Sequence, residues 1–134
     1  MTETSTPARI RRKHTAGWRA PLDAQARPAR YVGRGTRYGN PWVIAETDTL
    51  SGWTVNWAGI GRPPTGLRPE IPAHNQRDAH TLAVELFEVW VHSQPDLLDR
   101  ALRELAGRDL MCWCPASLPC HADVLLALAN PTPA

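Results

Sequence analysis

The run "DLMCWC" at residues 109–114 constrains the fold of this chain most. It is apolar at nearly every position, as expected of a strand buried on both faces in the centre of a sheet. Apolar residues at helical spacing precede it from Pro95 onward, and Gly107 supplies the stop between helix and strand. A short loop follows, and then a final helix that begins at Cys120 or His121. Helix, glycine, buried strand, loop and helix in this order predict an α/β domain.

The rest of the chain fits one such domain. Residues 77–92 have the apolar periodicity of a helix, whereas the front half is basic, irregular and rich in loops, with short strands expected at 8–12 and within 52–57. We therefore expect a small single α/β domain over residues 8–130, in which helices flank a central sheet that contains the buried CWC strand.

Three segments are expected to lie outside the regular part of this domain. Residues 48–73 are rich in proline and glycine, which indicates an irregular surface excursion. The two ends, residues 1–7 and 131–134, are predicted to be disordered tails.

Composition narrows the class of protein. A chain of 134 residues can bury a core without a metal or a disulfide, and no stretch approaches the roughly 18 apolar residues of a membrane span. The start of the chain lacks the apolar region of a secretion signal, and three cysteines fit a disulfide framework poorly. We predict a cytoplasmic protein with no membrane partner.

Positive charge is concentrated at the front of the chain. Residues 1–40 hold nine arginines and lysines against two acids, whereas the remaining residues hold six basic side chains against eleven acids. Such a basic arm attracts phosphate groups, on nucleic acid or on a small ligand. No helix-turn-helix, zinc-finger or RNA-binding signature accompanies the charge, so nucleic acid remains the less favoured partner.

All three cysteines lie in the stretch "CWCPASLPCHAD". Cys112 and Cys114 are two apart on the expected strand, so their side chains share a face. Cys120 and His121 open the next helix, where the helix dipole lowers a thiol pKa and stabilises the reactive thiolate. With Asp123 in the first turn, we interpret Cys120, His121 and Asp123 as the candidate catalytic groups.

A metal site is the second interpretation of these residues. Zinc is the candidate cofactor, with Cys112, Cys114, Cys120 and His121 as its four ligands, although their spacing matches no standard zinc knuckle. Simple packing of Cys112 and Cys114 in a buried strand is an equally good explanation for those two.

A glycine-rich loop in the front half is the candidate anion cradle. Its glycines permit turns that expose backbone amides, and its arginines add charge-assisted donors. Aromatic residues near it and near the cysteines could stack on a flat ligand. The candidate ligand-binding residues are Gly33, Arg34, Gly35, Arg37, Asn40, Trp42 and Trp113.

These motifs resemble those of a family of small bacterial and phage proteins of unknown function, domain-of-unknown-function family 4326. The resemblance rests on "YVGRGTRYGNPW", "LAGRDLMCWC" and "CHADVL", and the helix between them is similar too. It covers nearly the whole chain, except the excursion at 48–73 and most of the basic arm. It implies that 33–42 and 112–123 are the family's signature segments, and it implies no activity.

Three hypotheses follow. In the leading one, the protein has a cleft for a nucleotide-like or other phosphorylated ligand. An extension of this hypothesis is that the protein is an enzyme that acts on that ligand. The alternative is a non-catalytic, zinc-stabilised module that binds nucleic acid or a partner protein through its basic N-terminal arm. In the third, the signature residues only maintain the fold of an interaction protein.

Overall fold

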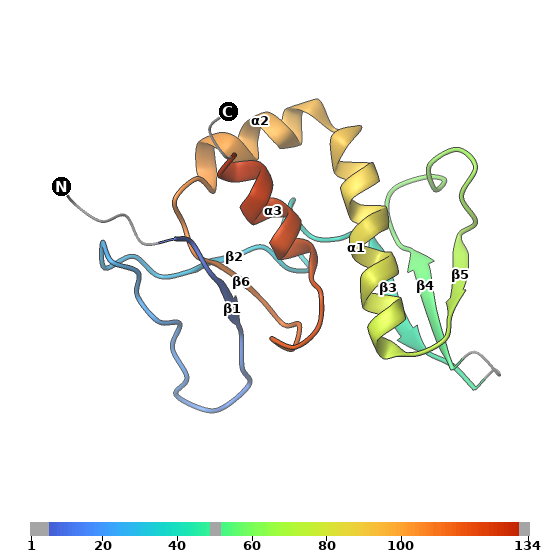
Figure 1. The fold of residues 1–134 in the computed structure, drawn as a ribbon, viewed down its shortest axis with the longest axis horizontal. Helices are drawn as coiled ribbons and strands as arrows, with labels where there is room; N and C mark the ends of the chain where they lie inside the picture. The colour runs from blue at the N-terminus through green and yellow to red at the C-terminus, as the bar shows by residue number, and fades with distance from the viewer. Residues whose placement is uncertain (1–5, 49–51, 132–134) are drawn as a thin grey trace.

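The structure is a computed structural model that describes residues 6–48 and 52–131. It confirms a small single domain of mixed α/β type. The domain contains two three-stranded sheets, and its helices lie between and beside them (Figure 1). The elements in chain order are β1 (Arg9–Arg11), β2 (Arg30–Tyr31), β3 (Trp42–Glu46), β4 (Trp53–Trp57), β5 (Glu70–Ala73), α1 (Gln76–His92), α2 (Pro95–Glu104), β6 (Leu110–Cys112) and α3 (His121–Ala129).

The first sheet is parallel, and β6 is its middle strand. Arg9 pairs with Leu110 on one side, Arg30 pairs with Leu110 on the other, and all three residues of β6 are buried. The buried strand was therefore predicted correctly, but it ends earlier than expected. Trp113 and Cys114 lie beyond its last residue, Cys112.

The second sheet is antiparallel, in the order β3-β4-β5. It draws two strands from the segment 48–73. Strand β4 lies where a short strand was expected within 52–57, whereas β5 was not expected, and the prediction of an irregular excursion was wrong there. Val55 is fully buried in β4, whereas in β5 only Ile71 and Ala73 turn inward. The other two residues of β5 are Glu70 and Pro72, and proline is uncommon within strands, so this alternation is difficult to recognise in the sequence.

Helix α1 lies between the two sheets (Figure 1). It begins where the Asn75 side chain caps the amide of Asp78, at 2.8 Å. Phe87 and Val91 pack into a core with α2, α3 and β6, whereas Ala83 and neighbouring residues pack against the antiparallel sheet. One helix thus joins two hydrophobic clusters and fixes the sheets on either side of it.

Parts of the predicted tails and of the predicted excursion are not described by the structure. Residues 1–5 and 132–134 of the predicted tails lie outside the described residues, as do residues 49–51 of the excursion. Among the described helices, none is both long and apolar enough to cross a membrane.

The core around α3 gives a direct test of this packing. Leu125 in α3 is fully buried, so Leu125→Ala should lower the free energy of unfolding by about 2–5 kcal/mol through lost contacts and a cavity. Leu102→Ala in α2 is the matched control, because Leu102 is 47% exposed and should lose far less. Urea denaturation measures both, and equal losses would contradict this assignment of the core.

Candidate functional site

A cleft of about 730 Å³ opens where α1 meets the ends of both sheets. The structure brings ten of the predicted site residues to its walls, although they come from three separate parts of the chain. These residues are Gly33, Arg34, Gly35, Asn40, Trp42, Cys112, Trp113, Cys114, Cys120 and His121. The two predicted site residues that do not line the cleft are Arg37 and Asp123.

The glycine loop after β2 approaches the cleft closely. Gly35 has a φ of +94°, which side chains other than glycine rarely tolerate. A Cβ at Gly33 would lie 2.5 Å from the hydroxyl oxygen of Tyr31, so the ring of Tyr31 fits only over a glycine. The Tyr31 hydroxyl also donates to the carbonyl oxygen of Arg34, at 3.1 Å. These contacts hold Arg34 at the edge of the cleft.

Asn40 and Trp42 are held in place by the protein itself. The Asn40 amide donates to the Ala83 carbonyl in α1 at 3.0 Å, and its oxygen accepts from the Trp42 amide at 2.9 Å. Trp42 is 2% exposed and packs edge-on against Trp57. Asn40 therefore fastens the start of β3 to α1, and Trp42 is a wall of the cleft rather than a free stacking surface.

The three cysteines form a compact cluster at the buried side of the cleft. Their Sγ atoms all lie within 4.8 Å of one another, and Cys112 and Cys120 are 3.2 Å apart as free thiols. Cys112 and Cys120 are each 1% exposed, while Cys114 is partly exposed. Three thiols so close together can hold a metal ion.

His121 lies beside this cluster in a defined tautomer. Its Nε2 is 2.8 Å from the Val32 carbonyl oxygen, which can only accept, so Nε2 carries the proton. Nδ1 therefore keeps its lone pair, and it lies 3.5 Å from the Sγ of Cys120. Burial lowers the pKa of His121, which favours this neutral form.

The acidity of the thiols differs from the prediction. Hydrogen bonds from the Cys114 and Cys120 thiols lower the pKa of Cys112 to about 3, because they stabilise its thiolate. The same hydrogen bond to Cys112 raises the pKa of Cys114 to about 11 and that of Cys120 still further. The expectation that the helix dipole makes Cys120 the low-pKa thiol was wrong, since the neighbouring sulfurs outweigh the dipole.

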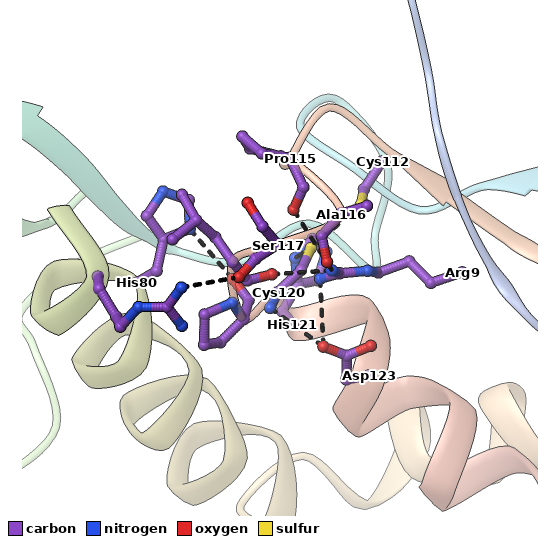
Figure 2. Close-up of polar contacts among 12 residues, drawn as sticks. Arg9, His80, Cys112, Pro115, Ala116, Ser117, Cys120, His121 and Asp123 are labelled. Atoms are coloured by element: carbon purple, nitrogen blue, oxygen red, sulfur yellow. Dashed lines mark hydrogen bonds and ion pairs between the residues drawn. The ribbon is translucent and has the colours of Figure 1, made fainter.

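Asp123 and Arg9 perform structural roles next to the cluster (Figure 2). The Asp123 carboxylate accepts from the Cys120 amide at 3.2 Å and pairs with Arg9 at 3.2 Å. The Arg9 guanidinium also donates to the carbonyls of Ala116 and Leu118, at 2.9 and 2.8 Å. Arg9 thus clamps the loop between Cys114 and Cys120, and is not available as a phosphate-binding residue of the basic arm.

The remaining predicted residues lie nearer the surface. Arg37 is exposed. Trp113 is 37% exposed and stacks on His14, with ring centroids 4.0 Å apart.

The cleft also contains residues that sequence reasoning did not select: Tyr31, Trp53, Gln76 and His80. His80 is 9% exposed, and its Nδ1 donates to the Pro119 carbonyl at 3.1 Å. His80 lies on the apolar face of α1, four residues after Gln76, which also lines the cleft. This position was the signal in the sequence that could have identified His80 as a cleft residue.

Comparison with known proteins identifies the family. A family model described as domain of unknown function DUF4326 matches residues 10–131. The chain belongs to this family. No curated protein and no solved structure matches the chain significantly. The matched range includes both the glycine loop and the cysteine segment.

The Arg9 clamp can be tested by substitution. Arg9→Ala should lower the free energy of unfolding by about 2–3 kcal/mol, because loop carbonyls and Asp123 lose a charged donor whose side chain is 13% exposed. Arg11→Ala, an exposed neighbour on the same strand, is the control and should change stability by less than about 0.5 kcal/mol. Chemical denaturation and amide exchange at Ala116, Ser117 and Leu118 report the effect. Equal stability of the two variants would refute the clamp.

Proposed function

We propose that the cleft binds a nucleotide or a similar phosphorylated ligand with a flat ring. The observation that carries the proposal is the composition of this one cavity. An exposed arginine and a glycine loop lie on one side of it, and tryptophan and aliphatic side chains line its other walls. A volume of about 730 Å³ also falls within the range of small-molecule sites.

The loop after β2 is the phosphate-binding part of this proposal. The backbone amides of Arg34 and Gly35 donate no hydrogen bond to the described residues, and both residues are exposed. The Arg34 guanidinium forms no ion pair within the described part of the chain. Two open amides and one unpaired guanidinium at the same place favour an anion.

The inner walls suit the ring of such a ligand. Trp42, Trp53, Val43 and Ile44 line the side that belongs to the antiparallel sheet. Apolar and aromatic walls with a few polar groups at one end are typical of sites that bury most of a ligand. The ring would lie along this wall, and the phosphate would point toward Arg34.

The cysteine cluster supports a second proposal, a zinc ion held by the Sγ atoms of Cys112, Cys114 and Cys120. Nδ1 of His121 lies near Cys120 but outside this compact group of three, and it would complete the ligand set by moving toward the other two sulfurs. Tetrahedral zinc separates a sulfur ligand from a nitrogen ligand by roughly 3.5 Å, and the Cys120 Sγ and His121 Nδ1 are 3.5 Å apart. The hydrogen bond from His121 to Val32 orients the ring, as second-shell contacts do at zinc sites.

Zinc with four protein ligands would have a structural role. It would tie the end of β6 to the start of α3 and, through the Val32 contact, to the loop that carries Arg34. The cysteines would then shape the floor of the cleft rather than attack the ligand. Burial and a raised pKa also argue against a free, reactive thiolate at Cys120, so we propose a binding function and assign no nucleophile.

Calorimetric titration with adenosine monophosphate, adenosine and inorganic phosphate tests the ligand proposal. The monophosphate should bind more tightly than either fragment, because only it contacts both the loop and the apolar wall. Arg34→Ala should weaken monophosphate binding at least tenfold by removing a charged hydrogen bond, and should leave adenosine binding unchanged.

Arg37→Ala is the matched control, since Arg37 lies three residues away, is exposed and does not line the cleft. The ligand proposal fails if the two arginine variants behave alike, or if none of the adenosine, guanosine, cytidine and uridine monophosphates binds.

Metal analysis of the purified chain tests the zinc proposal. One zinc per chain is expected, and serine at any of the three cysteines should remove stoichiometric binding. His121→Ala should lower zinc affinity at least tenfold and change the visible spectrum of the cobalt-substituted protein, whereas His74→Ala, at an exposed histidine, should do neither. A His121→Ala variant with unchanged affinity and spectrum would exclude His121 as a ligand. A chain that binds no zinc would exclude the site.

A further inference from the structure

Six of the nine basic side chains in residues 1–40 fall into two groups. In the first group, arginines are neutralised by acids of the folded domain. The ion pairs are Arg9 with Asp123, Arg27 with Asp23 and Arg30 with Glu104. These side chains support the fold, so they do not contribute a free positive surface.

The second group lies at the end of β1 and in the bend that follows it. Arg11 and Lys13 are exposed, Arg12 is half-buried, and none of the three forms an ion pair within residues 6–48 and 52–131. Together with His14 and Thr15 they line a hollow of about 350 Å³. Three adjacent uncompensated cations around a concave surface favour a phosphate group there.

Trp113 connects this hollow to the cleft, because it lines both. Arg12 lies at the same junction, with its guanidinium carbon 4.9 Å from the ring centroid of Tyr31 and 5.0 Å from that of Trp113. Tyr31 is itself a wall of the cleft. A continuous path therefore runs from Arg34, past Tyr31 and Trp113, to Arg11 and Lys13.

The contact between His14 and Trp113 shows that a flat ring fits at this junction. The two rings are nearly parallel, at 15°, with centroids 4.0 Å apart. A flat ring thus already lies on the face of Trp113, and His14 is an exposed residue of the bend. A nucleobase could take the same position, as bases do on the aromatic platforms of single-strand binders.

We propose that the cleft and this hollow together bind single-stranded nucleic acid. One nucleotide would occupy the cleft, the next base would stack on Trp113, and the phosphate beyond it would lie over Arg11 and Lys13. This inference rests on the proposed function of the cleft. A single strand is required because a base must be unstacked and unpaired to enter a cleft walled by tryptophans.

A length series of oligonucleotides tests the inference on the full chain. Fluorescently labelled, 5′-phosphorylated deoxythymidine and deoxyadenosine strands of one, two and four nucleotides are compared with a duplex of four base pairs held in a hairpin. The tetranucleotide should bind at least tenfold more tightly than the mononucleotide, and the duplex no more tightly than the mononucleotide.

Substitutions test whether the tighter binding of the tetranucleotide comes from the hollow at residues 11–15. Arg11→Ala/Lys13→Ala should weaken tetranucleotide binding at least tenfold and reduce its logarithmic salt dependence by about two, while mononucleotide binding stays unchanged. Arg19→Ala/Arg68→Ala removes the same charge from exposed residues outside both hollows and should have little effect. Arg34→Ala should weaken both ligands.

The outcomes separate this inference from the proposed function. If mononucleotides bind through Arg34 but longer strands gain nothing, or if both double variants weaken binding equally, the inference is wrong and the proposed function stands. Tetranucleotide binding that depends on Arg11 and Lys13 but not on Arg34 would also overturn the inference, because the cleft would then be empty. If no mononucleotide binds, the proposed function itself fails.

Discussion

The site depends on the parallel hydrogen bonding of β6 to β1 on one side and β2 on the other. Parallel strands end at the same edge of a sheet, so the segments that follow them are delivered to one place. Residues 12–15 follow β1, residues 32–35 follow β2, and residues 113–120 follow β6. The basic bend, the glycine loop and the cysteines meet at this edge although they are distant in sequence. The antiparallel sheet adds the apolar wall because α1 packs directly against it and, together with α3, belongs to the core that contains β6 (Figure 1).

Side chains from neighbouring elements then hold the irregular loop that carries the cysteines. Arg9 of β1 donates to the carbonyls of Ala116 and Leu118, while Arg77 and His80 of α1 donate to those of Ser117 and Pro119 (Figure 2). A loop without regular structure leaves such carbonyls unpaired, and each would cost free energy if it were buried without a donor. The donors fix the spacing between Cys114 and Cys120, and hence the closeness of the three sulfurs. The arrangement of the three cysteines therefore depends on β1 and α1 as much as on the cysteine segment.

The regular elements could be predicted from the sequence, whereas the roles of individual polar side chains could not. Helical periodicity, with Pro95 at the start of one helix and Gly107 after its end, predicted the helices, and the apolar run predicted β6. Cys112 and Cys114 were expected to share a face of this strand; the strand ends at Cys112, yet the sulfur atoms still lie close together. The errors involve tertiary contacts: Arg9 was assigned to a basic arm because its partner Asp123 is 114 positions away, and Cys120 was assigned a low pKa before its distance to Cys112 was known. Strand β5 was missed because its pairing with β4, rather than its composition, makes it a strand.

Charge balance links the two proposed parts of the site. Without a metal, hydrogen bonds among the three thiols lower the pKa of Cys112 and raise those of Cys114 and Cys120. A divalent ion would instead hold all three as thiolates, which leaves a single net negative charge at the floor of the cleft. Because an anionic ligand is repelled by that floor, its phosphate should lie at the rim, where Arg34 and Arg12 are placed. The apolar wall formed by Trp42 and Trp53 then remains for the uncharged ring. In the proposed complex, the same arrangement would orient a nucleotide with its phosphate toward the hollow at residues 11–15, which is the direction in which a longer strand would continue.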